Sequence, residues 1–355
     1  MKKKIAFVVE KISNRAGIER AVINSVNGLI KTGKYDISII SIFTDNSDYP
    51  AYLLDKNVKL IHLRINKGSK YAWYIKFVKA IRKVIKNESI RYVIGTTHGI
   101  NSCLGSVRKN SKVIGCEHFN YDSCSKIMRF SKYITYPKLD ALVLLTIPDS
   151  KRYFYVGENK LYVIPNIVSF QTEDNAKFDA KRIIAVGRLS RQKGFDYLIQ
   201  VAKKLKNEIP EWQIDILGDG DQREYLLNEI QKNNLNNFVN IKPATNNIME
   251  ELLKSSIYVM TSRFEGLPMV LIEAQECGLP IVSFDCKEGP NQIIQDNKNG
   301  YLVEVGDINI FADKVISITK NEEMWNVFSK NAKENADNYS EGRIIKLWME
   351  LFDKV

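Results

Sequence analysis

The chain has 355 residues, of which 45% are hydrophobic and 26% are charged. This length fits two α/β domains better than one compact core, and the composition excludes a disordered or fibrous protein. No apolar run reaches the ~18 residues of a membrane-spanning helix. The apolar stretch after Lys4 is too short for a signal peptide, so we interpret it as the first strand.

The two halves of the chain differ in charge. Residues 1–165 carry 29 Lys and Arg against 12 Asp and Glu, a net +17, whereas residues 166–355 carry 23 against 29, a net −6. The basic half is expected to meet an anionic partner, and nucleic acid, a membrane surface and a phosphorylated acceptor are all candidates. The five cysteines have no paired spacing, which indicates neither disulfides nor a zinc site and favours a cytoplasmic protein.

Short β-rich runs alternate with amphipathic helical stretches along the chain, a pattern typical of doubly wound parallel sheets. A polar stretch from Gln171 to Lys181 interrupts it. The sequence therefore predicts two Rossmann-like α/β domains, residues 1–168 and 169–340, and a helix over 341–355 that packs back toward the first domain. The expected strands are Ile5 to Glu10, Ile37 to Phe43, Val58 to Leu63, Tyr92 to Thr96, Lys112 to Cys116, Ala141 to Leu145, Leu161 to Ile164, Arg182 to Val186, Gln213 to Leu217, Val239 to Lys242, Ile257 to Met260, Ile281 to Phe284 and Tyr301 to Val303.

A glycine-rich basic loop, GRLSRQKG, runs from Gly187 to Gly194 between a strand and a helix that begins near Phe195. Glycines let a backbone approach a phosphate, a helix N-terminus points N–H groups at it, and Arg and Lys add positive charge. A phosphate site and a solvated basic turn both agree with this loop.

A second segment, EGLPMVLIEAQECGLP, contains a helix with Pro268 at its start and Gly278 at its end. Glu273 lies within the apolar run of this helix, where an acid usually needs a partner, and a ribose diol could supply one. Glu265, before the helix, would then face sugar hydroxyls. The alternative is that Glu273 lies on a wet helix face and Glu265 interacts with the helix dipole.

The ordered segments GRLSRQKGFD, LGDGD, SRFEGLPMVLIEAQECGLPIV and NGYLV together resemble the family 4 glycosyltransferases. The resemblance covers the C-terminal half. It implies the GT-B fold, in which two domains face a cleft, and transfer of a sugar from a UDP-sugar with retention at the anomeric carbon. It also implies a polyprenyl-diphosphate-linked glycan of a bacterial surface polysaccharide pathway as the acceptor.

The resemblance also assigns roles to residues. Arg188 and Lys193 would bind the donor diphosphate without a cofactor or metal, Glu273 the ribose, and Glu265 the transferred sugar. In the first domain, the family's paired glycines correspond here to Ala16-Gly17. The other implied donor-site residues are Gly17, Gly187, Pro243, Ala244, Thr245, Gly266, Leu267 and Pro268.

Two histidines follow predicted strands and compete for one role. The family carries a histidine beside the donor sugar, and His118 after Glu117 is our first choice, with His98 as the alternative. The catalytic candidates are thus His118, Glu265, Arg188 and Lys193. Asp219 and Asp221 mimic a metal-binding acid pair, but their place between a strand and a helix favours turn and capping roles.

The basic half contains a lysine-rich helical segment over residues 67–83. Tyr74, Val78, Ile81 and Ile85 have the spacing of a core face, which leaves Trp73 and Phe77 for an interfacial face. Core packing with a solvated basic back is the interpretation that we favour for this segment. We expect peripheral binding to the anionic inner face of the cell membrane through Lys70, Lys76, Lys79, Lys83, Lys126, Arg129 and Lys132.

Two other functions agree with parts of the sequence. A sugar-nucleotide epimerase on a related two-lobed fold would bind the same donor. A nucleic-acid-binding protein would account for the charge, but the chain contains no recognised nucleic-acid motif.

Overall fold

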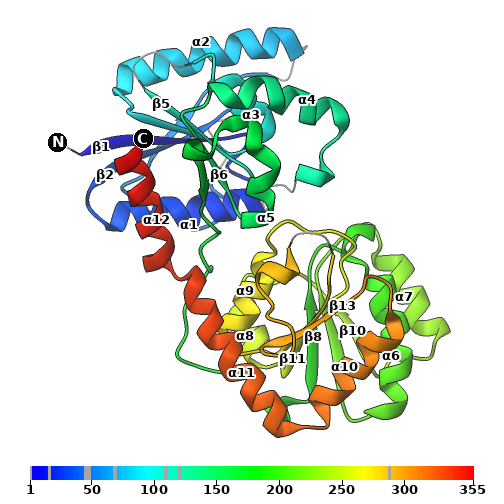
Figure 1. Cartoon of the computed structure of the whole chain (residues 1–355). Helices are drawn as coiled ribbons and strands as arrows, with labels where there is room; N and C mark the ends of the chain where they lie inside the picture. Colours follow the sequence, from blue (N-terminus) through cyan, green and yellow to red (C-terminus); the bar gives the residue numbers. More distant parts are fainter. Residues whose placement is uncertain are drawn as a thin grey trace. The chain divides into compact units, whose positions relative to one another are not determined.

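The computed structural model of the protein divides into two compact units, unit 1 with residues 1–167 and 341–355 and unit 2 with residues 168–340. It describes residues 2–14, 17–43, 49–66, 70–107, 111–118, 121–286 and 289–355, and only the backbone of residues 70–72 and 123. Ala16 and the side chain of Lys70 therefore lie outside the described part. Each unit is a parallel sheet covered by helices (Figure 1).

Unit 1 contains a seven-stranded parallel sheet in the order β3-β2-β1-β4-β5-β6-β7. Its strands are β1 Lys3–Val9, β2 Tyr35–Ser41, β3 Lys59–His62, β4 Tyr92–Gly95, β5 Lys112–Cys116, β6 Ala141–Leu144 and β7 Leu161–Val163. Its helices are α1 Gly17–Lys31, α2 Lys70–Glu88, α3 His98–Leu104, α4 Lys126–Thr135, α5 Ile147–Ser150 and α12 Glu341–Lys354, with short 3-10 turns η1 Tyr121–Ser123, η2 Tyr136–Lys138, η3 Lys151–Val156 and η4 Glu158–Lys160.

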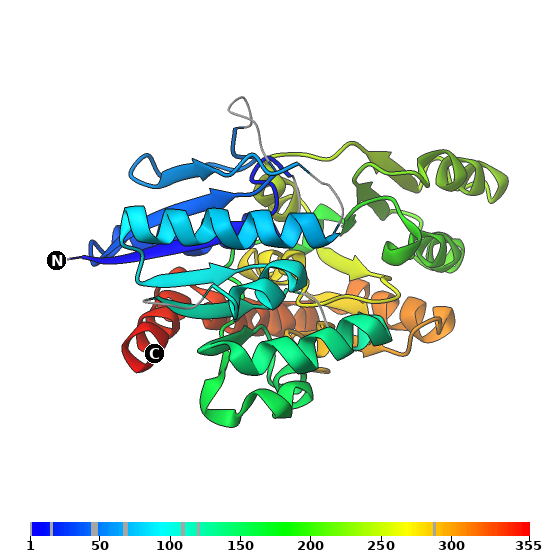
Figure 2. The same ribbon diagram turned by 90° about the horizontal axis from the view of Figure 1, so that it is seen from above.

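Alternate residues of β1 separate two hydrophobic cores, because successive side chains of a strand point to opposite faces. Phe7 belongs to the core that α1 and α12 cover, whereas Val8 belongs to the core beneath α2 and α3. Figure 1 shows these helix pairs on opposite sides of the sheet, and Figure 2 shows the cyan α2 lying across it from above.

Helix α12 closes unit 1, although it follows unit 2 in the sequence. Trp348 packs edge-on against Phe7 with ring centroids 5.8 Å apart, and the hydroxyl of Tyr92 donates a hydrogen bond of 2.6 Å to the carbonyl of Phe352. Lys3 and Asp353 form a surface ion pair at 2.8 Å. The chain therefore returns to the first unit to complete its core.

Unit 2 contains a six-stranded parallel sheet in the order β10-β9-β8-β11-β12-β13. Figure 1 shows α6, α7 and α10 on one side of it and α8, α9 and α11 on the other. Its strands are β8 Arg182–Val186, β9 Gln213–Leu217, β10 Val239–Lys242, β11 Ile257–Met260, β12 Ile281–Phe284 and β13 Gly300–Val303. Its helices are α6 Phe195–Glu208, α7 Arg223–Lys232, α8 Ile248–Leu253, α9 Met269–Glu276, α10 Ile308–Thr319 and α11 Glu322–Ala336, with 3-10 turns η5 Phe178–Ala180, η6 Arg191–Lys193, η7 Pro290–Gln292 and η8 Asp337–Tyr339.

The predicted class of two doubly wound parallel α/β units is confirmed. Within the described residues, no helix is both long and apolar enough to cross a membrane.

Of the two interpretations of this helix, core packing agrees with the structure, and an interfacial face at Trp73 and Phe77 does not. Phe77 is fully buried and stacks on Trp73 with ring centroids 5.2 Å apart, and Trp73 packs near Phe43. The reason is helical spacing: Phe77 lies four residues before Ile81 and belongs to the same inward stripe.

We predict that Trp348→Ala lowers the free energy of unfolding by ~3–5 kcal/mol, because it removes a buried ring from the junction of α12 with β1. Urea unfolding followed by circular dichroism measures this. Lys346→Ala, at an exposed position of the same helix, is the control and should leave the midpoint unchanged. Equal midpoints for both variants would contradict the packing role.

Candidate active site

The carboxyl ends of the unit 2 strands meet at one edge of the sheet, where open α/β sheets bind ligands. The chain runs outward from β8 through β9 to β10 and then returns to β11, which pairs with β8 on the other side. The order of strands therefore reverses between β8 and β11. The loops that follow these two strands carry the first two motifs.

Glycines let these loops touch backbone to backbone. Gly194 has a φ of +64°, and a Cβ there would lie 2.1 Å from the carbonyl oxygen of Thr261, after β11. A Cβ on Gly218, after β9, would lie 1.9 Å from the carbonyl oxygen of Gly187. Any larger residue would push the loops apart, so these two glycines set the close spacing of the site.

Lys193 and Glu265 form an ion pair across the reversal point, 2.6 Å from Nζ to Oε1. The same carboxylate oxygen accepts a hydrogen bond of 2.7 Å from the hydroxyl of Ser262. A Cβ on Gly187 would lie 3.0 Å from the Lys193 side chain, so this glycine makes room for the lysine stem. The structure thus brings Gly187, Lys193 and Glu265 together.

Arg188 is an exposed cation of this loop, as is Arg191. Its neighbour Leu189 is fully buried, and the Leu189 N–H donates a 3.0 Å hydrogen bond to the carbonyl of Asp219. The guanidinium of Arg188 makes no hydrogen bond or ion pair with any residue that the structure describes. An anchored loop with an exposed guanidinium can receive an anion from solvent.

Glu273 lies on α9 and is 1% exposed. Burial raises the pKa of the Tyr258 phenol, and the charges of Glu265 and Glu273 raise it further. Both carboxylates therefore act on one buried side chain of β11. Gly266, Leu267 and Pro268 lie between Glu265 and the start of α9, and Pro268 is the N-cap of this helix.

One clamp was missed by sequence reasoning. Arg263 donates to both carboxylate oxygens of Asp196, at 2.8 and 2.6 Å, and its guanidinium stacks over the ring of Tyr197 at 4.2 Å. This bidentate pair ties the loop after β11 to the first turn of α6. Arg263 stands in the SRF segment directly before EGLP, so the sequence did show a cation there. Its partner Asp196 lies 67 residues away, which local sequence reasoning does not reveal.

Pro243, Ala244 and Thr245 are exposed after β10. Asp219 accepts a hydrogen bond of 3.1 Å from the Ala244 N–H, which is a turn-stabilising contact. Among the described residues, no cluster of three or more His, Cys, Asp or Glu side chains is arranged to hold a metal ion.

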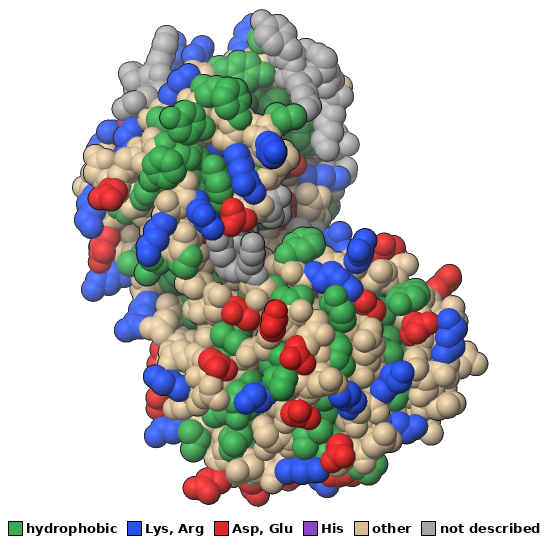
Figure 3. All heavy atoms as spheres, turned by 45° about the vertical axis from the view of Figure 1, so that its right-hand side comes forward, with side chains coloured by type: hydrophobic (Ala, Val, Ile, Leu, Met, Phe, Trp, Pro, Cys, Tyr) green, Lys and Arg blue, Asp and Glu red, His purple; other side chains and the backbone are tan. Residues whose placement is uncertain are grey.

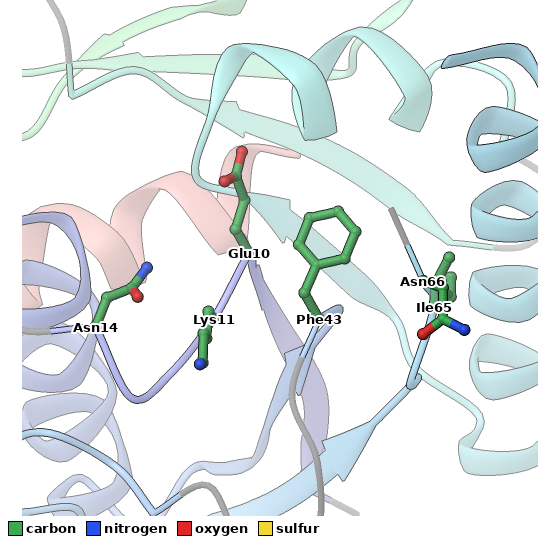
Figure 4. Close-up of a pocket in the computed structure, with 6 residues that line it drawn as sticks. All are labelled: Glu10, Lys11, Asn14, Phe43, Ile65 and Asn66. Atoms are coloured by element: carbon green, nitrogen blue, oxygen red, sulfur yellow. The ribbon is translucent and has the colours of Figure 1, made fainter. Parts of the chain in front are cut away.

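A pocket of about 340 Å³ opens at the carboxyl ends of β1, β2 and β3 in unit 1 (Figure 4). Phe43 offers a ring face, and the Glu10 carboxylate accepts a hydrogen bond of 3.3 Å from the Thr97 hydroxyl. A Cβ on Gly17, at the start of α1, would have no described atom within 4 Å. The pocket is lined by Glu10, Lys11, Asn14, Phe43, Ile65 and Asn66.

The two candidate histidines lie at the same edge of unit 1, after β4 and β5. The Nδ1 of His98 lies 3.4 Å from the hydroxyl oxygens of both Tyr136 and Ser102. The Nε2 of His118 lies 3.5 Å from the sulfur of Cys116. Burial lowers the pKa of His98, and it lowers the pKa of His118 to about 4, so both imidazoles are neutral near pH 7.

The placement of Lys132 on a basic surface was wrong. Its side chain is 0% exposed, and its ammonium lies 2.7 Å from the buried carboxylate of Glu117, immediately before His118. Burying an ammonium is tolerated because it is paired. The sequence carried no signal of this, because Lys132 stands beside Arg129 and Lys126 in an otherwise amphipathic segment.

Known proteins resemble the chain over its whole length. The family description "Glycosyl transferases group 1" matches residues 169–335. The amylovoran biosynthesis glycosyltransferase AmsD of Erwinia amylovora is 30% identical, with 99% of each chain covered. A Campylobacter jejuni N-acetyl-D-galactosaminyltransferase, named for a PP-undecaprenol-linked glycan, is 27% identical with 99% of each chain covered.

A solved structure is also similar. TarM of S. aureus, crystallised as a mutant with UDP, fondaparinux and alpha-GlcNAc-glycerol, has a TM-score of 0.84 at 18% identity. The match covers 99% of this chain and 100% of the other. The GT-B fold that the motifs implied is therefore confirmed.

We predict that Gly194→Ala destabilises unit 2 by more than Gly306→Ala. Both residues have positive φ, which costs roughly 1–3 kcal/mol for a side chain, but only Gly194 also faces a backbone oxygen, whereas nothing lies within 4 Å of a Cβ on Gly306. The difference between the melting temperatures of the two variants measures the cost of the steric overlap between the new Cβ at position 194 and the carbonyl oxygen of Thr261. Equal melting temperatures would contradict the close backbone contact.

Proposed function

The chain belongs to the group 1 glycosyl transferases, and we propose that it transfers a hexose or N-acetylhexosamine from a UDP-sugar to a lipid-linked glycan in bacterial surface polysaccharide synthesis, with retention at the anomeric carbon. The observation that carries this proposal is the Lys193–Glu265 pair, 2.6 Å apart at the strand reversal point and flanked by the exposed Arg188. UDP in the TarM crystal supports the choice of nucleotide.

In this proposal Arg188 and Lys193 bind the diphosphate, together with the N–H groups of Gly266 and Leu267 ahead of α9. Glu273 accepts hydrogen bonds from the ribose diol, and the base lies beside the exposed loop from Pro243 to Thr245. Glu265 has one oxygen, Oε2, that takes no hydrogen bond from the described residues and can accept from a sugar hydroxyl.

Transfer breaks the bond between the anomeric carbon and the diphosphate oxygen, and negative charge grows on the departing diphosphate. Arg188 and Lys193 stabilise this charge, which is the main catalytic term in the proposal. The acceptor hydroxyl attacks from the face that the diphosphate leaves, without a covalent nucleophile, and its proton passes to the departing diphosphate oxygen. His118 lies on the sugar side in this scheme. Because two cations serve the diphosphate, no metal is invoked.

The acceptor proposal rests on two supports. The Campylobacter relative is named for a glycan on PP-undecaprenol. The pocket of unit 1 combines an aromatic ring, Phe43, with the hydrogen-bonding groups of Glu10, Asn14 and Asn66, a set of side chains suited to a sugar ring and its hydroxyls.

The deciding experiment is a panel of UDP-sugars and other nucleotide sugars incubated with the protein and lipid extract. We expect nucleotide release from one or a few UDP-sugars that depends on the extract. A product formed without extract, with the nucleotide still attached, would favour an epimerase. Release from none of the donors would overturn the proposal.

We predict that Arg188→Ala lowers turnover by roughly 100-fold or more, because charge stabilisation of the leaving diphosphate is lost. Glu273→Gln should instead weaken UDP binding, since a neutral amide keeps the shape but loses the charge-assisted hydrogen bonds to the ribose. Calorimetry with UDP separates the two effects. Near-normal turnover in the first variant, or unchanged affinity in the second, would contradict the corresponding role.

We also propose that unit 1 binds an anionic membrane surface through α4. Ile127 and Phe130 on this helix are 83% and 66% exposed, and Tyr133 and Ile134 are exposed as well, whereas the charged Lys132 points inward. Figure 3 shows hydrophobic side chains gathered on this face of unit 1 with Lys and Arg around them. An apolar stripe beside exposed cations such as Lys126 suits the interface of an anionic leaflet.

We predict that the protein sediments with anionic vesicles but not with neutral ones, and that high salt weakens the binding. Ile127→Ser/Phe130→Ser should reduce binding by removing the inserted side chains, and Lys126→Glu, on the same helix, should reduce it by charge reversal. Leu227→Ser, an equally conservative loss of an exposed apolar side chain on α7, should have no effect. Equal indifference to both vesicle types would favour a soluble acceptor.

A further inference from the structure

A buried polar cluster lies behind the candidate histidines of unit 1. Glu117, the first residue after β5, is 2% exposed, and Lys132 of α4 is 0% exposed. Aromatic rings surround the ammonium, with centroids 5.4 Å away for Tyr153 and 5.8 Å for Tyr136. The pair is therefore withdrawn from water on all sides.

Every charged atom of the pair has a partner. The Lys132 ammonium donates to Glu117 Oε2 at 2.7 Å, to the Tyr153 hydroxyl at 3.0 Å and to the Cys124 sulfur at 3.3 Å. Glu117 Oε1 accepts from the Tyr136 hydroxyl and, at 3.0 Å, from Asn101 Nδ2. Asn101 also donates to the carbonyl of Cys116 at 3.0 Å.

Stability alone is a weak reason for such a pair. Desolvating two charges costs several kcal/mol per ion, and apolar residues of similar volume often serve a core equally well. The pair does something that apolar residues cannot do, because a carboxylate only accepts hydrogen bonds and so fixes the direction of each donor around it.

The hydrogen bond between Glu117 and Tyr136 also determines how Tyr136 can bond to His98. Burial raises the pKa of the Tyr136 phenol well above its usual value, and the charge of Glu117 adds to the effect, so the hydroxyl keeps its proton. This proton is given to Glu117, so the Tyr136 oxygen can only accept from His98 Nδ1, 3.4 Å away. The Ser102 hydroxyl lies at the same distance from Nδ1 and can accept or donate. Only the tautomer with the proton on Nδ1 satisfies both hydroxyl oxygens, and it leaves Nε2 unprotonated.

We propose that Glu117 and Lys132 are positioning residues that set the tautomer of His98 and hold the backbone that carries His118. Lys132 pairs with Glu117, Glu117 directs the Tyr136 hydroxyl, and Tyr136 accepts the Nδ1 proton of His98. Through Asn101 the same carboxylate is tied to the last carbonyl of β5. The effect on turnover rests on the proposed transferase function, whereas the tautomer does not.

The charges of the pair also oppose each other at His98. Burial is the main cause that lowers the pKa of His98, while Glu117 raises it and Lys132 lowers it. Among the described residues, the titratable groups facing the two imidazoles are Glu117 and Cys116 at β5, Lys132 of α4 and Tyr136 of η2. A neutral imidazole with a fixed tautomer is the expected outcome.

The test is nitrogen NMR of the full-length protein labelled with ¹⁵N-histidine, which gives separate signals for protonated and unprotonated ring nitrogens. The chain has three histidines, so single His→Gln variants assign each signal. We expect the Nδ1–H tautomer for His98 in the native protein. His62 in β3, at the far edge of the sheet, is the internal reference.

Two double variants separate position from charge. Glu117→Leu/Lys132→Met removes the acceptor, so the Tyr136 hydroxyl turns to His98 and its tautomer switches to Nε2–H. Glu117→Gln/Lys132→Met keeps an acceptor oxygen and should retain the Nδ1–H tautomer of His98.

Turnover is the second measurement. We expect the Glu117→Leu/Lys132→Met variant to lose at least tenfold in turnover and the Glu117→Gln/Lys132→Met variant far less, with UDP affinity unchanged in both. Lys138→Met, an exposed lysine of η2, is the control for charge loss.

The proposal would be overturned if His98 kept the Nδ1–H tautomer in a folded Glu117→Leu/Lys132→Met variant. If that variant does not fold, Tyr136→Phe removes only the hydroxyl, and a His98 tautomer that remains wholly Nδ1–H would overturn it equally. A switched tautomer with unchanged turnover would support the positioning role and instead remove His98 from the proposed transfer reaction.

Discussion

The parallel sheet is the constraint on which both units depend. Because all strands of a sheet point the same way, every loop after a strand lies at one edge, and groups far apart in sequence meet there. Lys193 and Glu265 are 72 residues apart and contact each other only because β8 and β11 are neighbours. The same rule brings Glu10, Phe43 and Asn66 to one pocket in unit 1.

Backbone contact at that edge adds a second constraint. The loops after β8, β9 and β11 pack closer than side chains allow, which restricts Gly194 and Gly218 to glycine. The glycines of the GRLSRQKG and LGDGD segments were read from the sequence as approach points for a phosphate. In the structure their first effect is on loop packing, and the resulting spacing is what lets Lys193 reach Glu265.

Most strands were predictable because they are short, nearly continuous apolar runs that are buried on both faces. The strands β3, β7 and β10, at the edges of the sheets, are only partly buried. All the strands lie within two residues of the expected positions. The grouping of Arg188, Lys193, Glu265 and Glu273 followed from motif order. Partners chosen by tertiary packing were not predictable. Lys132 looked like a surface cation since nothing local distinguishes it from Lys126, and only its distance to Glu117 reveals its place.

Each unit thus carries a lysine–glutamate pair at its strand ends, with opposite consequences. Lys193 and Glu265 remain partly exposed, with 20% and 10% of their side chains accessible to solvent. An incoming diphosphate can therefore bind the ammonium of Lys193, and a sugar hydroxyl can bind the carboxylate of Glu265. Lys132 and Glu117 are sealed at 0% and 1%, and separating them would leave a buried charge unpaired. The first pair suits exchange with a ligand, and the second can only hold its surroundings in place.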